Sequence, residues 1–282
     1  MNPRYFVVLG FIGLLSSSQT TAQRRSVQIG YTTTLQNVAA AKASGFDFVE
    51  LSTTELAGLS DSDFEQAVAH VRQIGLPAPA AYLFLPPALK VTGPDIDPEE
   101  QMAYVRKAFA RLERLGTQIV VFGSGPARKV PDGFPKDRAF QQLVAFGRLI
   151  APEARARGIT VAVEPQRREE TNIINSAAEG LELVQAVDDP NFQLMIDFYH
   201  LASEKEDPEI VVRAREHIRH LHMANPQGRV FPLAWSEYDY APFFAKLREI
   251  GYDKRISVEA SAKDFPSEAP QAIALLRRAF ER

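Results

Sequence analysis

The feature that most constrains the fold of this chain is a regular alternation of short apolar runs with longer amphipathic stretches, which begins at Ser26. The apolar runs are rich in β-branched residues and apolar on both faces, as strands buried between helices and a core must be. Several amphipathic stretches end at a glycine, for example Gly75 and Gly116, which is a helix stop signal. We predict strands at 26–32, 46–52, 78–85, 118–124, 159–164, 192–198, 218–224 and 255–260, and helices at 35–45, 61–74, 97–115, 137–157, 175–187, 207–217, 240–250 and 267–281.

Eight strand–helix units in about 255 residues match the size and order of a (β/α)8 barrel. A doubly wound parallel sheet is the main alternative, but such folds usually carry the motif G-x-G-x-x-G after the first strand. Residues 31–35 lack this motif, and Gly123-Ser124-Gly125 lacks its third glycine. No long Pro/Gly/Ser linker interrupts the alternation. We therefore predict an α/β fold with a single TIM-barrel domain over residues 26–282.

The first 22 residues have the three-part pattern of a cleavable signal peptide. Arg4 supplies the positive start, residues 5–15 form an apolar run, and a polar stretch leads to a cleavage site near Ala22. An eleven-residue helix would reach only about 17 Å, against about 30 Å of hydrocarbon, so we expect no stable membrane anchor. An apolar N-terminus without a targeting role is the alternative. The pattern favours an exported, periplasmic protein.

Composition narrows the chemistry of any site. The chain has no cysteine, which excludes disulfides, thiolate nucleophiles, iron–sulfur clusters and zinc fingers. Any metal must therefore be held by oxygen and imidazole. The 32 basic and 35 acidic side chains give a net charge of −3, so a nucleic acid is not an expected partner.

Four of the predicted strands carry a polar side chain at or near their carboxyl end. In a barrel these ends share one mouth, where catalytic groups lie. Three carboxylates and one imidazole crowded there would repel one another unless a cation neutralised them. Mostly oxygen ligands favour Mn, Co, Mg or Fe(II) over a structural zinc. The four residues are Glu164, Asp197, His222 and Glu259.

Each of these residues also has a simpler interpretation when it is taken alone. A carboxylate at a strand end can be a solvated loop residue or a helix cap, and His220 can be a core histidine. Glu50, at the end of the second predicted strand, either binds a substrate hydroxyl or neutralises a nearby arginine or lysine. The segment 123–129, with Arg128 and Lys129, either cradles an anion or forms a solvated connection.

Four segments resemble the sugar phosphate isomerase/epimerase superfamily of barrels. They are VEP and RREETNIINS within 163–176, IDFYH at 196–200, HLHMA at 220–224 and SVEA at 257–260. The resemblance covers nearly all of the chain after residue 26. The ketose 3-epimerases are the most similar in function, and hydroxypyruvate isomerases, inosose dehydratases and the endonuclease IV group are more distant relatives.

The resemblance implies a role for individual residues. The metal ligands of such epimerases match Glu164, Asp197, His222 and Glu259. The residues that contact substrate match Glu170 and His200, and Arg229 matches an arginine after the metal-binding histidine, with one extra residue between them in this chain.

The activity that the resemblance implies is a metal-dependent isomerase or epimerase. One divalent ion, Mn, Co or Mg, would chelate a keto sugar and stabilise an enediolate. Glu164 and Glu259 would act as the acid/base pair. The predicted export favours a free or glycosidic keto sugar over a sugar phosphate.

Three other functions remain open at this point. A sugar lyase or dehydratase would use the same ligands and the same enediolate. A nuclease like endonuclease IV would need several histidines around more than one zinc, and this chain has five histidines in all. A sugar-binding module without catalysis is the third. The sequence leaves the sugar, the inverted carbon and the choice between monomer and homodimer undetermined.

Overall fold

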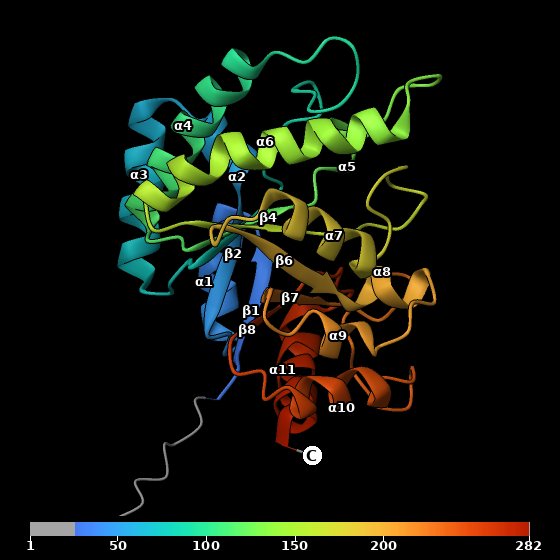
Figure 1. The fold of residues 1–282 in the computed structure, drawn as a ribbon. Coiled ribbons are helices and arrows are strands. Elements are labelled where there is room, and N and C mark those ends of the chain that lie inside the picture. Colours follow the sequence, from blue (N-terminus) through green and yellow to red (C-terminus); the bar gives the residue numbers. More distant parts are fainter. Residues whose placement is uncertain (1–25, 282) are drawn as a thin grey trace, which may run out of the picture.

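A computed structural model describes residues 26–281. Eight parallel strands form one closed barrel in sequence order, β1 to β8, and β8 pairs with β1 (Figure 1). This confirms the predicted barrel. The strands are β1 (Gln28–Thr33), β2 (Phe48–Ser52), β3 (Ala80–Tyr82), β4 (Ile119–Phe122), β5 (Thr160–Val163), β6 (Phe192–Asp197), β7 (Ile218–Met223) and β8 (Arg255–Val258).

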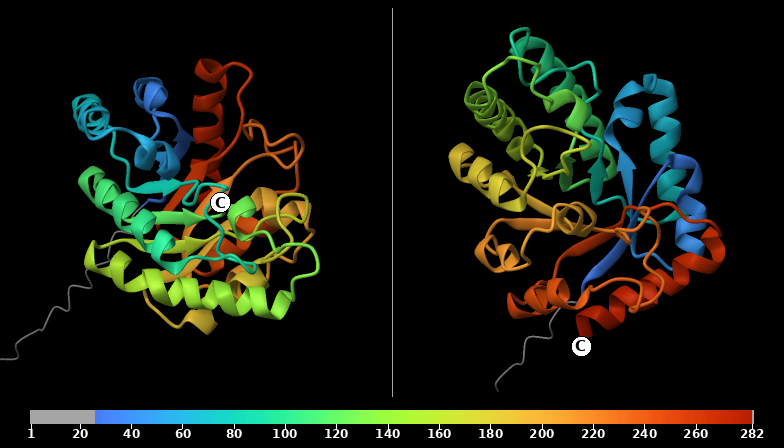
Figure 2. Two further views of the ribbon diagram at one scale, coloured as in Figure 1. Left: turned by 90° about the horizontal axis from the view of Figure 1, so that it is seen from above. Right: turned by 90° about the vertical axis from the view of Figure 1, so that its right-hand side faces the viewer.

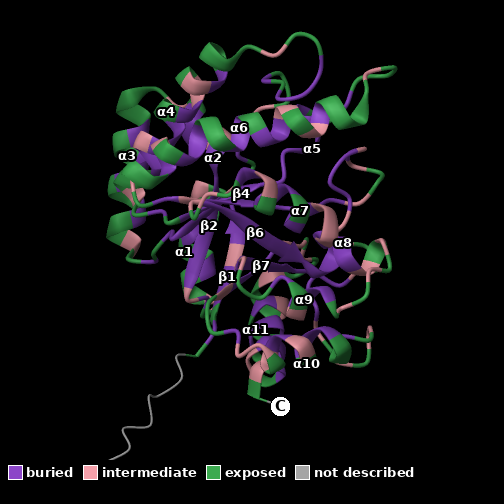
Figure 3. Cartoon of the chain, in the orientation of Figure 1, coloured by how far each residue is buried: buried purple, intermediate pink, exposed green. Residues whose placement is uncertain are grey.

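Helices surround the strands, as the two views in Figure 2 show. Most strand residues are buried, while the helices expose their outer faces (Figure 3). The helices are the 3₁₀ turn η1 (Leu35–Asn37), α1 (Val38–Ala43), α2 (Thr53–Gly58), α3 (Asp61–Ile74), α4 (Pro98–Leu115), α5 (Gly125–Arg128), α6 (Lys136–Ala156), α7 (Ala177–Val187), α8 (Phe198–Ser203), α9 (Ile210–Arg213), α10 (Ala241–Glu249) and α11 (Phe265–Glu281).

The local sequence explains where the long helices begin and end. At the start of α4, the Asp97 side chain accepts hydrogen bonds from the backbone N–H groups of Glu99 and Glu100, and Pro98 occupies the first turn. The same helix ends at Gly116, whose φ of 77° is in the left-handed region that glycine adopts without strain. These signals place both ends of α4 within one residue of the prediction.

An apolar layer fills the interior of the barrel below its carboxyl-terminal mouth. Phe48 is its largest member, and it packs there because Gly30 on the neighbouring strand has no side chain: a Cβ at Gly30 would lie 2.2 Å from the Phe48 ring. The layer closes the barrel from below, so the polar side chains nearer the strand ends lie above an apolar base. Its buried members are Phe48, Ala80, Ile119, Val121, Ala162 and Met195.

Several short helices occur where the sequence predicted strand or loop. The sixth strand ends at Asp197, one residue early, because the Asp197 side chain accepts a hydrogen bond from the backbone N–H of Tyr199 at 2.8 Å and caps α8. The helix predicted at 207–217 is reduced to the single turn α9.

The predicted signal peptide, residues 1–22, lies outside the described residues. Within residues 26–281, no helix has the length and apolar character needed to cross a membrane.

Candidate active site

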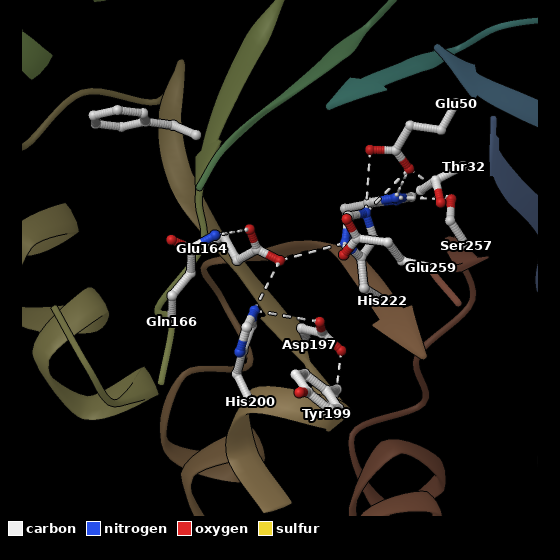
Figure 4. Close-up of polar contacts among 12 residues, drawn as sticks. Thr32, Glu50, Glu164, Gln166, Asp197, Tyr199, His200, His222, Ser257 and Glu259 are labelled. Atoms are coloured by element: carbon white, nitrogen blue, oxygen red, sulfur yellow. Dashed lines mark hydrogen bonds and ion pairs between the residues drawn. The ribbon is translucent and has the colours of Figure 1, made fainter. Parts of the chain in front are cut away.

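The four strand-end residues predicted as metal ligands meet at the mouth of the barrel (Figure 4). They come from four neighbouring strands, β5 to β8. One potential ligand atom from each lies within 4.8 Å of the others. The four are Glu164 just after β5, Asp197 at the end of β6, His222 in β7 and Glu259 just after β8.

The His222 ring lies between the carboxylates of Glu164 and Glu259 on one side and the carboxylate of Glu50 on the other. Its Nδ1 is 3.4 Å from Glu164 Oε1 and 3.0 Å from Glu259 Oε2. Its Nε2 is 3.1 Å from both carboxylate oxygens of Glu50. Because Glu50 can only accept when ionised, Nε2 carries a proton. In the neutral ring, Nδ1 is then left as a lone pair that faces the cluster.

The cluster has the properties of a cation site. Glu164 Oε1 and Asp197 Oδ2 are both buried and have no hydrogen-bond partner among the described residues. Such buried oxygens are costly unless an ion or a ligand group meets them. Three carboxylates and one imidazole fit a divalent ion that prefers oxygen, and the residues present therefore fit the metal that the sequence predicted.

Charge interactions shift the pKa values of the cluster in the metal-free protein. Burial raises the pKa of Asp197 to about 6, with Glu259 and Glu164 adding to the rise and His200 and Arg229 opposing it. Burial also acts to raise the pKa of Glu164, but His222, whose Nδ1 lies 3.4 Å from Glu164 Oε1, together with the charges of His200 and Arg229, lowers it to about 2. Glu164 is therefore ionised at neutral pH.

Glu50 lies one layer below the cluster, and its surroundings correct one of the two sequence interpretations. Its side chain is fully buried, and among the described residues its partners are histidine and serine, not an arginine or a lysine. A contact of Glu50 with a substrate hydroxyl stays a prediction. His220 Nε2 lies 2.8 Å from Glu50 Oε2, and the Ser257 hydroxyl donates to the same oxygen at 2.7 Å. Glu50 thus orients His222 from the side away from the mouth.

His200 extends from α8 over the cluster. Its Nδ1 accepts a hydrogen bond from the backbone N–H of Arg167 at 3.3 Å, so in the neutral ring Nε2 carries the proton. That Nε2 is 3.6 Å from Asp197 Oδ2 and 3.9 Å from both Glu164 Oε1 and Glu170 Oε2. His200 therefore presents a donor toward the space between these carboxylates.

Arg229 closes the same space from the β7–β8 side. Its Nη2 donates to Glu259 Oε2 at 2.6 Å and lies 3.5 Å from Asp197 Oδ2, and its Nη1 is 3.5 Å from Glu170 Oε1. The guanidinium also lies 4.7 Å above the Tyr199 ring. The structure thus brings Glu170, His200 and Arg229 to the cluster despite the extra residue before Arg229.

Sequence reasoning missed three supporting residues. Gln166 Nε2 donates to Glu164 Oε2 at 3.2 Å. The Tyr199 ring supports Arg229, and nothing in the sequence pattern signals this contact. Ser257 had a signal, because it lies two residues before Glu259 on the same face of the strand. In the segment 123–129, Arg128 is fully buried and donates to two backbone carbonyls, so it is not a solvated residue, whereas Lys129 is exposed.

The comparisons with known proteins agree with this architecture. A family model described as xylose isomerase-like TIM barrel matches residues 38–279. The chain belongs to this family. An L-ribulose 3-epimerase from Mesorhizobium japonicum is 26% identical over 264 residues, which cover 92% of this chain and 82% of that protein. An L-ribulose 3-epimerase from Methylomonas sp. is 26% identical over 237 residues, covering 80% and 78%.

A solved structure has the same fold. The crystal structure of a His-tagged D-allulose 3-epimerase from Methylomonas sp. matches with a TM-score of 0.80 and 24% identity, over 90% of this chain and 98% of that chain. At this identity the likeness bears on the fold alone. The family match confirms the superfamily resemblance found in the sequence.

Proposed function

We propose that this chain is a divalent-metal-dependent epimerase of a free or glycosidic keto sugar. The observation that carries the proposal is the convergence of Glu164, Asp197, His222 and Glu259, with ligand atoms within 4.8 Å of one another at the barrel mouth. The relatives named L-ribulose 3-epimerase support a ketose as the substrate class.

These four residues would hold the metal. A divalent ion there would act as a Lewis acid, lowering the cost of negative charge on the oxygens of a bound ketose. Mn, Co and Mg all suit a donor set of three carboxylates and one imidazole. His222 would contribute Nδ1, because Glu50 occupies its Nε2.

The chain's own residues would move the proton. Glu164 is ionised at neutral pH, since despite its burial its pKa is lowered to about 2 by the nearby His222, with His200 and Arg229 adding to the effect. It is therefore ready to accept a carbon-bound proton next to the carbonyl, which leaves the sugar as an enediolate. Glu259, the other member of the pair, would return a proton to the opposite face.

Three further residues would hold the sugar. The Nε2–H of His200 and the guanidinium of Arg229 would donate to sugar oxygens, and Glu170 would accept from a hydroxyl. Glu170 is placed for this by Arg167, whose Nε donates to Glu170 Oε1 at 2.9 Å. Fixing the sugar in this way holds the reacting C–H bond against a base, which is a large part of the rate gain in such reactions.

The test is proton exchange in deuterated water. The purified chain, loaded with Mn²⁺, is incubated with L-ribulose or D-allulose and followed by ¹H NMR. Epimerisation predicts a new ketose that keeps all the atoms of the substrate except for one deuterium in place of the proton at the inverted carbon. Loss of water or of an alcohol would instead indicate a lyase or dehydratase, and no exchange with any ketose offered, in protein that binds Mn²⁺, would reject the proposal.

We also propose that the protein is exported to the periplasm. The support is the basic start, apolar run and small-residue site within residues 1–22. Expression with and without these residues, followed by fractionation, tests it: the full chain should reach the periplasm, and the shortened chain should stay in the cytoplasm.

A further inference from the structure

A fully buried arginine lies against the backbone that carries Glu164. Arg128 ends the short helix α5, and no part of its side chain is exposed. Its Nη1 donates to the Phe122 carbonyl at the end of β4, at 3.0 Å, and its Nη2 donates to the Glu164 carbonyl at 2.6 Å. One planar guanidinium therefore ties the ends of two neighbouring strands together.

Gly123, five residues before Arg128, lies against the Glu164 side chain itself, and Gly125 lies against Gln166. A Cβ at Gly123 would lie 2.1 Å from Glu164 Oε2 and 2.7 Å from Gln166 Nε2. A Cβ at Gly125 would lie 2.6 Å from Gln166 Oε1. Gly123 does not need glycine for its backbone, because its φ is outside the left-handed region. It is needed for the space that the carboxylate and Gln166 occupy.

We propose that Arg128 and Gly123 are positioning residues that fix the Glu164 carboxylate at the metal cluster. Arg128 holds the Glu164 main chain from below, and Gly123 leaves room for the carboxylate at the side. The inference rests on the proposed function of Glu164. Arg128 reaches no substrate, since it is fully buried, so it acts only through Glu164.

The competing interpretation is that Arg128 only stabilises the fold. The chain offers a control in Arg111, which is 6% exposed and lies on α4, where it also joins other elements through backbone carbonyls and pairs in addition with Asp61. Its Nη1 donates to the carbonyls of Leu56, Ala57 and Leu59 at 2.6, 3.1 and 2.8 Å, and none of these residues belongs to the metal cluster. Loss of Arg128 removes the donor of the buried Glu164 carbonyl, and loss of Arg111 removes the donor of the Leu56 and Ala57 carbonyls, so both cost stability.

The experiment compares Arg128→Met with Arg111→Met in the full chain. Both should lower the Tm of the metal-free protein. Only Arg128→Met should weaken Mn²⁺ binding, measured by calorimetry, by about 10- to 100-fold, the range found when groups that orient metal ligands are lost. Arg128→Lys should recover part of the affinity, because a single ammonium keeps the charge but cannot span both carbonyls. Equal Mn²⁺ affinity in the two Met variants and the unmodified chain would overturn the proposal.

A second pair of variants keeps the test open if Arg128→Met does not fold. Gly123→Ala should weaken Mn²⁺ binding, because its methyl group displaces the Glu164 carboxylate. Gly147→Ala is the steric control: its Cβ would lie 2.6 Å from Val187 Cγ2 in the α6 packing, so it should lower Tm and leave the affinity unchanged.

Crystal structures of Arg128→Met or Gly123→Ala separate this inference from the proposed function. Glu164 should be displaced from Asp197 and His222 in either variant, whether or not the protein acts on a ketose. An unmoved Glu164 carboxylate overturns the positioning role. Unmodified protein that binds Mn²⁺ and epimerises no ketose overturns the proposed function, while a displaced Glu164 with weaker Mn²⁺ binding would still uphold the positioning role.

Discussion

Replacing Glu50 by Gln tests how the barrel selects one nitrogen of His222 for the metal. Among the described residues, Glu50 Oε2 has three donors, from His220 at 2.8 Å, Ser257 at 2.7 Å and His222 at 3.1 Å, whereas Oε1 hydrogen-bonds only His222, at 3.1 Å. A glutamine would therefore place its carbonyl at the Oε2 position and its amide at the Oε1 position. The amide then needs an acceptor, and only the His222 Nε2 is there to supply one.

This exchange moves the proton of His222 to the wrong side of the ring. With Nε2 accepting, the neutral imidazole carries its proton on Nδ1, which faces Glu164 and Glu259 at 3.4 and 3.0 Å. A protonated Nδ1 cannot bind a cation. We expect the Mn²⁺ affinity of Glu50→Gln to fall about 10- to 100-fold, or about 1.4–2.8 kcal/mol. The loss of a buried charge-assisted hydrogen bond should also cost the metal-free fold about 1.5–3 kcal/mol.

Calorimetric titration with Mn²⁺ measures the first effect, and ¹⁵N NMR of the imidazole shows which nitrogen is protonated. Asp47→Asn is the control, because the Asp47 carboxylate also accepts a buried donor, the backbone N–H of Ile29 at 2.7 Å, but precedes β2 at the opposite end of the strands. It should lower Tm and leave Mn²⁺ binding intact. Glu50→Gln with Mn²⁺ affinity within about twofold of the unmodified chain would refute the reasoning.

Replacing Glu259 by Gln should lower kcat about 10²- to 10⁴-fold in the epimerase assay, and undiminished turnover would remove Glu259 from the acid/base pair. The Mn²⁺ affinity of the metal-free protein should fall as pH drops below about 6, because burial raises the pKa of Asp197 to about 6 and its proton must then leave. The Mn²⁺ affinity should also depend on pH above 6.5, because burial lowers the pKa of His222 but the charges of Glu50 and Glu259 raise it overall. A Mn²⁺ affinity that calorimetry finds constant from pH 5 to 8 would contradict this. His200→Asn should raise KM by up to about tenfold, as expected for one lost hydrogen bond, without changing Mn²⁺ affinity; an unchanged KM would remove His200 from the sugar site.

The existence and order of the strands could be predicted because buried parallel strands require apolar, β-branched runs, and each of the eight predicted runs overlaps one strand. The lengths of the strands could not be predicted. The third run, 78–85, yields only Ala80–Tyr82, because Leu83 adopts a φ of 49° and leaves the extended conformation. A run of apolar residues in the sequence does not reveal such a backbone turn.

The position of a side chain along the barrel axis also could not be predicted from the sequence. Alternation gives the face of a strand but not how far the strand continues. Strand β2 runs two residues past Glu50, to Ser52, whereas Glu164 follows the last residue of β5. Glu50 therefore lies beneath the cluster and Glu164 in it, although both follow an apolar run in the sequence.

The burial of Arg128 depends on contacts across the fold. Arginine is rarely buried unless it is paired, so a solvated loop was the natural expectation for residues 123–129. Its partner, the Glu164 carbonyl, lies 36 positions away in the sequence. The two meet because β4 pairs with β5, and no local sequence pattern predicts that contact.

Charge balance at the mouth bears on both the ion and the substrate. Glu164, Asp197 and Glu259 contribute three negative charges, and Arg229 contributes one positive charge at 2.6 Å from Glu259 and 3.5 Å from Asp197. A divalent ion with neutral His222 would make this group neutral, whereas a monovalent ion would leave a buried negative charge uncompensated, which is costly. Once the divalent ion is bound, no positive charge is left over for a phosphate. This charge balance supports the proposed neutral ketose over a sugar phosphate, and the support does not depend on where the protein resides.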